Sequence, residues 1–522
     1  MWFPSIPLVS LGLSLLASIP SVLAQNDIPL WVQGGLEGAN ATDTSYNTGG
    51  TIVVNGFTMT VPKNLLVQFP AAWVPFGDFV ERLDDFIGFE TLIIGNTVNN
   101  VPLVGQIVIY EFFESVSGGY IESLNYTEGT IQIHNGPVVR ISDPNGVFSV
   151  GYSDHPFMTA DDVSPSITSF SGFPMCIPRN TTDPLCPLSN RPASGAGIFV
   201  APDQLVMAPF MPGDFITFSG FRRKGTNEVV AFSIVALNVQ IQTTGNIVYV
   251  RMELGLLGIV SPSPIAEIPE SRFIGFVSNA LASVTLYAMD VDPCTGETND
   301  RIIATVGLRG GANAQMKFRY RNDILSGYTR EYRATAEIQG VPKTVVTKNG
   351  LVAGTYVQPV NVWIPAELGI PGAQPITHEF IGMDHLAKGV GKDALGRHWG
   401  ALDPFPQSGV TLPMVVCEEE QEEEEEGPTH GTGTIQGPEF EGRKLKKRFG
   451  GRHAYNPERA AAVESGQDKN TTEGTVKVAP AEAAAIAEKE AEEDLKFELE
   501  DSLELGVEVP SDAVDFEAPS NL

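Results

Sequence analysis

Two alternating apolar segments joined by an Asn-Gly dipeptide restrict the fold of this chain more than any other feature. Residues 51–61 contain Asn-Gly at 55–56, and residues 130–141 contain it at 135–136. Asn-Gly favours the tight type I′ turn, whose two central residues both need a positive φ. The alternation turns one side of each hairpin toward a core. The sequence therefore predicts antiparallel hairpins and an all-β fold.

A second segment recurs after each hairpin. Residues 73–79, Trp-Val-Pro-Phe-Gly-Asp-Phe, are similar to residues 210–215, Phe-Met-Pro-Gly-Asp-Phe, which lead into an alternating strand. The repeated order predicts two copies of one β unit. Over residues 50–241 these features resemble small OB-like β-barrel modules, and the core resembles uncharacterised secreted proteins of filamentous fungi. The resemblance implies tandem small OB-like barrels, or a sandwich, and no particular activity, since a fold does not fix a function.

Composition divides the chain further. Glycine and proline number 53 and 38, as expected for a fold with many turns. From Glu418 onward there are 28 acidic and 11 basic residues, a net charge of −17 out of −30, which leaves −13 for residues 1–417. Such an acidic segment buries little and repels itself, so we expect disorder there. The expected parts are a signal peptide (1–24), a first β module (25–110), a second (111–260) with a Cys176–Cys186 insertion, a third β region (261–365), an irregular Pro- and Gly-rich extension (366–417) and an acidic disordered tail (418–522).

Several features predict secretion. The apolar segment 8–19 ends at Pro20 and small residues, which favours cleavage before Gln25 over a membrane anchor. No later segment is apolar enough to span a membrane, and the overall acidity argues against nucleic acid as a partner. Lys447-Arg448 is a dibasic processing site of the secretory pathway. Asn-x-Ser/Thr sequons, the acceptors of N-glycans, are at Asn40, Asn125, Asn180 and Asn470.

The four cysteines suggest one short disulfide. Cys176 and Cys186 bracket a Pro-containing loop, and a bridge there would stabilise the fold by about 2–3 kcal/mol. Cys294 and Cys417 remain, and four cysteines allow three pairings.

Two segments contain metal-ligand types. His378, Glu379, His385 and His398 lie close together near Asp384 and Trp399, and imidazole and carboxylate groups suit zinc, copper or iron. The His-Glu-x-x-His helix is absent, so simple surface histidines are the alternative. A calcium-like loop contains Asp290, Asp292, Glu297, Asn299 and Asp300. It departs from the helix-flanked calcium pattern, and an acidic hairpin loop is the alternative.

No catalytic motif or cofactor fingerprint is present, so the sequence favours a non-catalytic extracellular or cell-wall protein, or a ligand-binding one. Its partner would be a cell-wall polysaccharide, stacked on aromatics such as Trp31, Trp73, Trp363 or Trp399, or a small apolar ligand. The alternative is a secreted enzyme without a motif, a cyclase or isomerase, or an accessory protein of a fungal natural-product pathway. A deep apolar pocket would favour the enzyme, and a flat aromatic face the binding protein.

We predict that the secreted form begins at Gln25 and carries N-glycans on Asn40, Asn125 or Asn180. The signal peptide and the sequons in turn-rich segments are the reason. N-terminal sequencing and a glycosidase mobility shift measure both properties. A protein that keeps Met1 and does not shift would contradict the prediction.

Overall fold

The structure is a computed structural model. It describes residues 28–406 except for 71, 110–116, 156, 193–196, 224, 264–265, 293–296, 310–314, 323–328, 360, 365–376, 379, 381–385, 389–390 and 393–397. The predicted signal peptide, acidic tail, Asn470, Lys447-Arg448, Cys294 and Cys417 lie outside the described residues. The described part is all-β, as predicted, and its helical segments are short: α1 (Phe76–Val80), α2 (Leu83–Phe86) and the 3-10 turn η1 (Leu188–Asn190).

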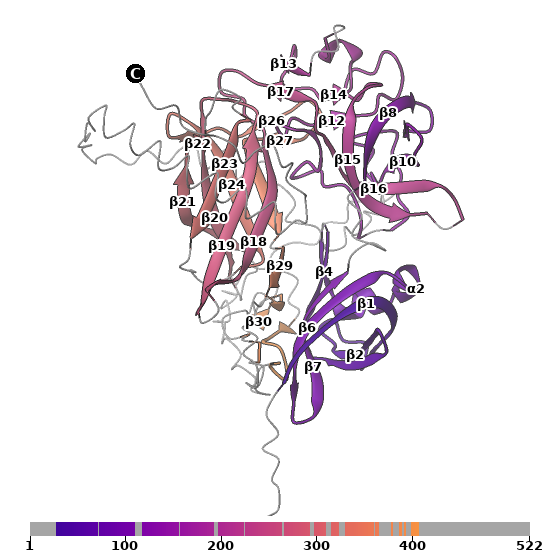
Figure 1. The fold of residues 1–522 in the computed structure, drawn as a ribbon, viewed down its shortest axis with the longest axis vertical. Helices are drawn as coiled ribbons and strands as arrows, with labels where there is room; N and C mark the ends of the chain where they lie inside the picture. The colour runs from indigo at the N-terminus through magenta and orange to yellow at the C-terminus, as the bar shows by residue number, and fades with distance from the viewer. Residues whose placement is uncertain are drawn as a thin grey trace, which may run out of the picture. The chain divides into compact units, whose positions relative to one another are not determined.

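The first barrel has five strands, drawn in indigo and violet in Figure 1. They are β1 (Ile28–Ala41), β2 (Gly50–Val54), β3 (Phe57–Val61), β6 (Glu90–Val98) and β7 (Val101–Ile109). The order is β3-β2-β1-β6-β7, and a parallel pairing of β3 with β7 closes the ring. Strands β4 (Leu66–Phe69) and β5 (Ala72–Pro75) continue the sheet beyond β7.

The second barrel repeats this topology. Its strands are β8 (Ser117–Asn125), β9 (Thr130–Ile133), β10 (Val138–Ile141), β15 (Phe215–Arg222) and β16 (Glu228–Ala236). Their order is β10-β9-β8-β15-β16, and parallel β10 and β16 close it. The two barrels therefore have the predicted OB-like form, in which the third and fifth strands meet. Shorter strands accompany the second barrel: β11 (Ile167–Ser169), β12 (Met175–Cys176), β13 (Ile198–Val200), β14 (Ala208–Pro209) and β17 (Gln240–Gln242).

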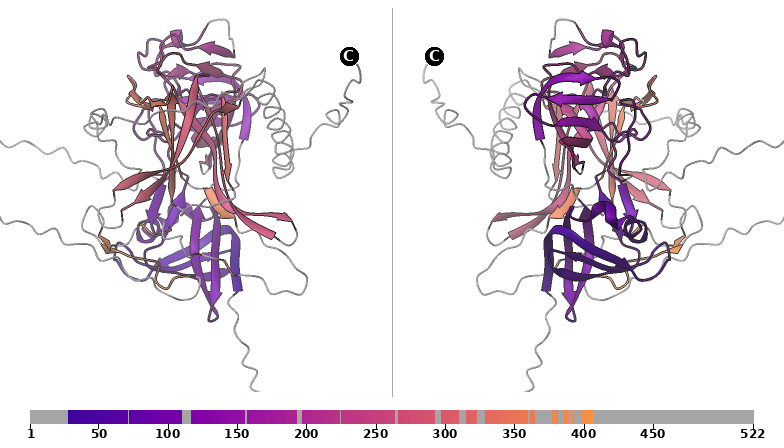
Figure 2. Two further views of the ribbon diagram at one scale, coloured as in Figure 1. Left: turned by 90° about the vertical axis from the view of Figure 1, so that its left-hand side faces the viewer. Right: turned by 90° about the vertical axis from the view of Figure 1, so that its right-hand side faces the viewer.

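A third region contains two sheets whose strands pair mostly in antiparallel fashion. The long hairpin of β18 (Val250–Ser263) and β19 (Ala266–Val277) forms the centre of one sheet (Figure 2). The other is built on β20 (Ala282–Val291) and β24 (Glu331–Ile338), and Phe273 and Tyr332 join the two, with ring centroids 4.9 Å apart. The domain boundary predicted after residue 260 falls inside β18. The remaining strands are β21 (Thr298–Val306), β22 (Leu308–Arg309), β23 (Lys317–Asn322), β25 (Val341–Pro342), β26 (Val345–Val346), β27 (Val352–Ala353), β28 (Thr355–Pro359), β29 (Asn361–Ile364), β30 (Gly391–Lys392) and β31 (His398–Trp399).

Both predicted Asn-Gly hairpins are present. Asn55 and Gly56 have φ values of 49° and 75° between β2 and β3, as a type I′ turn requires. Asn135, with φ 54°, lies in the connection between β9 and β10. The predicted face alternation also holds in β2, where Ile52 and Val54 are fully buried.

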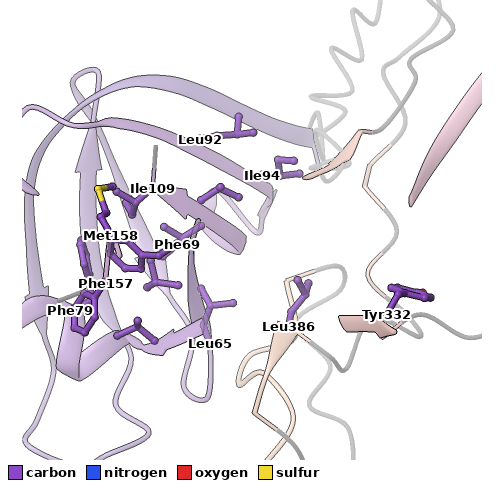
Figure 3. Packing of buried hydrophobic residues seen from close by; sticks show 14 of the residues in the cluster. Leu65, Phe69, Phe79, Leu92, Ile94, Ile109, Phe157, Met158, Tyr332 and Leu386 are labelled. Atoms are coloured by element: carbon purple, nitrogen blue, oxygen red, sulfur yellow. The ribbon is translucent and has the colours of Figure 1, made fainter. Parts of the chain in front are cut away.

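Phenylalanines fill the space at the helical side of the first barrel. Phe69, Phe79 and Phe86 are fully buried, and their ring centroids lie 5.0–6.2 Å apart. Phe157, from the long connection between β10 and β15, stacks on Phe86 at 5.9 Å. Its ring also lies 5.1 Å from that of Phe69 (Figure 3). Tilted and stacked rings at these distances are favourable packing. The first barrel and this connection therefore share one core.

Residues from the predicted irregular extension pack on the first barrel. Phe380 is fully buried and lies over Gly105 of β7, where any Cβ would overlap its ring. The Asn64 side chain donates to the Ala401 carbonyl at 2.7 Å and accepts from the Gly400 N–H at 2.9 Å. Residues far apart in sequence are thus joined by buried hydrogen bonds.

Among the described residues, no helix has the length and apolarity that crossing a membrane requires.

In each barrel a bulge in the fifth strand lies opposite a glycine of the fourth strand, and the extra residue is Gly105 in β7 and Phe232 in β16. The register of β6 against β7 shifts between Ile94 and Gly95, and the register of β15 against β16 shifts between Ser219 and Gly220. A Cβ on Gly95 would overlap the Leu103 carbonyl, and one on Gly220 would overlap the Val230 carbonyl. Such bulges let a strand curve enough for a small barrel to close.

We predict that Gly95→Ala and Gly220→Ala each destabilise the protein by about 1–3 kcal/mol, because the added methyl meets backbone that cannot move freely. The control is Gly38→Ala in β1, where nothing lies within 4 Å of the new Cβ. We expect it to change stability by less than about 0.5 kcal/mol. Urea unfolding midpoints compare the three variants, and equal midpoints would contradict the role given to the bulges.

Candidate ligand-binding surface

The structure places His378, the first predicted metal ligand, in a packing position. Its side chain is buried. Its backbone N–H donates to Asn96 Oδ1 at 2.8 Å, and its backbone carbonyl accepts from Asn96 Nδ2 at 2.9 Å. Burial lowers the pKa of His378, which favours the neutral ring. Glu379 and His385 lie outside the described residues, and only the backbone of His398 is described, in β31. A metal site here stays a prediction.

Trp399, beside those histidines, is part of a packed aromatic group. It is buried, and its ring meets Tyr46 edge-on at 5.1 Å. The Lys388 ammonium lies over both rings, 5.1 Å from Tyr46 and 5.9 Å from Trp399, and donates to the Tyr46 hydroxyl at 3.1 Å. This cation–π arrangement fixes the extension to the first barrel. Trp399 is therefore not an exposed sugar-stacking residue.

The calcium-like loop lies at the tip of the β20–β21 hairpin. Asp290 accepts two hydrogen bonds from Arg301, at 2.7 and 2.9 Å, and Asp300 pairs with Arg333. The Asp292 N–H donates to the Glu297 carbonyl at 2.7 Å. Asn299 is opposite Asp290 in the ladder. Two of the five predicted ligands thus already have arginine partners, as in an ordinary acidic hairpin. Within the described ranges, no cluster of three or more His, Cys, Asp or Glu suits a metal ion.

The sequence-predicted modification sites are accessible where they are described. Asn40, Asn125 and Asn180 are all exposed. Cys176 and Cys186 form the predicted disulfide, and both residues are fully buried in the core of the second barrel.

A pair of aromatic side chains, one exposed and one half-buried, lies on the outer face of the second barrel. Tyr120 of β8 is 57% exposed and stands opposite Phe215 of β15, with ring centroids 5.0 Å apart and planes at 73°. Leu237, also exposed, donates its N–H to the Phe215 carbonyl at 2.9 Å. Tyr120, Phe215 and Leu237 are called the aromatic platform below.

The backbone around the platform holds it in place. Asn238 accepts from the Phe215 N–H at 2.7 Å and donates to the Gly213 carbonyl at 3.1 Å, which fixes the start of β15. Gly118, two residues before Tyr120, leaves the area beside Phe215 without a side chain, and a Cβ there would lie 3.4 Å from the ring. Tyr120 and Phe215 thus present an apolar surface from paired strands, and Leu237 adds to it from the turn after β16.

Polar groups lie on the same strands. The Glu122 carboxylate and the His134 ring are more than half exposed and lie 3.8 Å apart. The backbone N–H of His134 donates to the backbone carbonyl of Tyr120 at 2.9 Å, so His134 is held next to the platform strand β8. An exposed aromatic with a carboxylate and an imidazole nearby offers stacking and hydrogen bonding together.

The sequence predictions missed this surface. They named tryptophans, of which Trp31 is 65% exposed but without a described aromatic neighbour, and Trp73 is half-buried. The side chain of Trp363 lies outside the described residues. The usable signal was Gly118-Gly119-Tyr120 together with the Gly-Asp-Phe start of β15, but their pairing is not local in sequence.

The chain was compared with protein-family models and with curated proteins. No protein-family model matches the chain, and no curated protein matches it significantly.

We predict that about 1 mM Ca²⁺, the range in which weak extracellular calcium modules bind, leaves the melting temperature of the protein unchanged. The reason is that Asp290 and Asp300 already bond to arginines, and the bond with Asp290 raises the pKa of Arg301. Scanning calorimetry with calcium or with a chelator measures the effect. Asp290→Asn, the matched variant, should cost only about 0.2–1 kcal/mol, since the pair is partly exposed. A calcium-dependent rise that Asp290→Asn removes would contradict this account.

Proposed function

We propose that the protein is a secreted, non-catalytic binding protein for a neutral cell-wall or matrix polysaccharide, and that the aromatic platform of the second barrel is its binding surface. The observation that carries the proposal is the contact of the exposed Tyr120 with the half-buried Phe215 on paired strands of an OB-like barrel. Barrels of this type bind oligosaccharides or oligonucleotides, usually on the face of strands two and three, whereas the platform lies between strands one and four.

The chemistry of the platform suits a sugar ring. A pyranose presents C–H groups on its faces and hydroxyls at its edge, so it stacks on an aromatic ring while its hydroxyls bond to neighbouring polar groups. Tyr120 and Phe215 supply the apolar surface, and Glu122 and His134 supply an acceptor and a donor. Tyrosine presents a large contact area with few rotatable bonds, so ordering it on binding costs little entropy.

Charge narrows the ligand class. Residues 1–417 carry a net charge of −13. An acidic surface repels nucleic acid and anionic polysaccharides, because binding to them depends on basic side chains. A neutral polysaccharide is not repelled by this negative charge.

Packing supports a binding role over catalysis. The interior of the second barrel is occupied by fully buried side chains, among them Ile131, Val139 and Ile234. The buried Arg191 and Asp214 bond to each other through both carboxylate oxygens, at 2.8 and 3.0 Å, so this acid stabilises the fold. The described groups thus give an aromatic surface on the outside of a filled barrel, which favours the binding protein over the enzyme.

We predict that Tyr120→Ala weakens binding to a soluble neutral glucan at least about tenfold, which corresponds to about 1.4 kcal/mol. Truncation removes the stacking surface, whereas Tyr120→Phe keeps it and should retain most of the affinity. Phe57→Ala is the matched control, because Phe57 is also about half exposed but lies in the first barrel. Affinity electrophoresis with glucan or with polygalacturonate measures binding. Equal loss in the Tyr120 and Phe57 variants, or preference for the anionic polymer, would contradict the proposal.

A further inference from the structure

The two barrels are equivalent strand by strand. In each, the first strand pairs with the second and fourth, the second pairs with the third, and the third closes against the fifth in parallel. Thus β1 corresponds to β8, β2 to β9, β3 to β10, β6 to β15 and β7 to β16. The repeat lets any surface position of one barrel be compared with the other.

Two of the sequons occupy the same place in this scheme. Asn40 lies at the end of β1 and pairs with Thr51 of β2, which pairs with Thr60 of β3. Asn125 is the last residue of β8 and pairs with Thr130, the first residue of β9. Both asparagines are exposed, beside neighbours that point into the core. Each sequon therefore lies on the outer face at the junction of the first two strands.

The backbone around Asn125 permits modification of its side chain. Its Oδ1 accepts from the N–H groups of Thr127 and Glu128, both at 3.1 Å, and so closes the turn between β8 and β9. Glycosylation uses the other atom. The amide nitrogen Nδ2 forms a bond to the anomeric carbon of a lipid-linked oligosaccharide, the bond from that carbon to the lipid pyrophosphate breaks, and Nδ2 loses one proton. The acceptor role of Oδ1 is kept.

We infer that N-glycans on Asn40 and Asn125 cover the outer face of the second and third strands next to the loop between the first two strands in both barrels, so that ligand is directed to the aromatic platform between the first and fourth strands of the second barrel. In OB-like barrels the usual oligomer-binding surface is the face of strands two and three with the loop between strands one and two. Both glycans would start at that loop. The inference rests on the proposed secretion of the protein.

The distance along β8 is consistent with this division. Tyr120 and Asn125 are five residues apart on one strand, and at about 3.3 Å per residue their Cα atoms are about 16 Å apart. Tyr120 moreover pairs with β15, whereas Asn125 pairs with β9, on the other side of β8. The glycan and the platform thus lie over different neighbouring strands.

A reporter cysteine tests whether the face is covered. Thr58→Cys places the reporter on the exposed side of β3, and Ile302→Cys, in β21 of the third region, is the matched exposed control. Each reporter is introduced into the secreted full-length protein with and without Asn40→Gln, and the protein without a reporter gives the background. A bulky polyethylene-glycol maleimide and N-ethylmaleimide are compared as labels.

With the glycan present, we expect the bulky label to react at position 58 at least about tenfold more slowly than in the Asn40→Gln protein. N-ethylmaleimide should differ by less than about twofold, and position 302 should not respond to Asn40→Gln. Equal rates for the bulky label at position 58, or an unmodified Asn40 or Asn125 in the glycopeptide masses of the secreted protein, would overturn the inference.

The same proteins separate this inference from the proposed function. If the face is covered as inferred, the Asn40→Gln, Asn125→Gln double variant binds the neutral glucan as well as the parent does, and Tyr120→Ala weakens binding. If the face is covered but the glucan does not bind, the proposed function fails alone. If the glucan binds through Tyr120 but the labelling rates are equal, the inference fails alone.

Discussion

Closure of each barrel by a parallel third and fifth strand is the constraint on which the other features depend. A parallel pair cannot be joined by a tight turn, so the chain must leave the third strand, form the fourth and return. In the first barrel the intervening segment contains α1 and α2, whose Phe76, Phe79 and Phe86 fill the core. In the second barrel it is the long connection that contains the disulfide. The bulges at Gly105 of β7 and Phe232 of β16, opposite Gly95 and Gly220, let the fifth strand bend back toward the third.

Closure also decides which outer faces remain available. In the first barrel the outer side of β6 and β7 is covered by Phe380 and by the Asn96–His378 hydrogen bonds. In the second barrel the corresponding strand β15 pairs with β8, where Tyr120 stays exposed against the half-buried Phe215. One repeated topology thus gives a packed face in one copy and an open face in the other. The difference explains why the second barrel is the proposed binding unit.

Local patterns in the sequence were sufficient for the hairpins and the short disulfide. Asn-Gly with alternating neighbours specifies β2–β3 and β9–β10 because the turn and its strands are contiguous. The same reasoning could not place Tyr120 beside Phe215 or Phe380 over Gly105, because these contacts join distant segments and depend on closure. His378 and Trp399 have residue types that bind metals and sugars, yet their burial in the interface with the first barrel could not be read from composition.

Hydroxyl-radical footprinting of the secreted, glycosylated protein tests the central claim most directly, since it measures the solvent access of individual aromatic side chains. With a soluble neutral glucan added, the account predicts slower oxidation of Tyr120 and Phe215. In the same experiment on the Asn40→Gln protein, oxidation of Phe57 and Trp31, which are exposed side chains of the first barrel, should not change. Protection of Phe57 or Trp31 with Tyr120 unaffected would contradict the assignment of the binding surface to the second barrel.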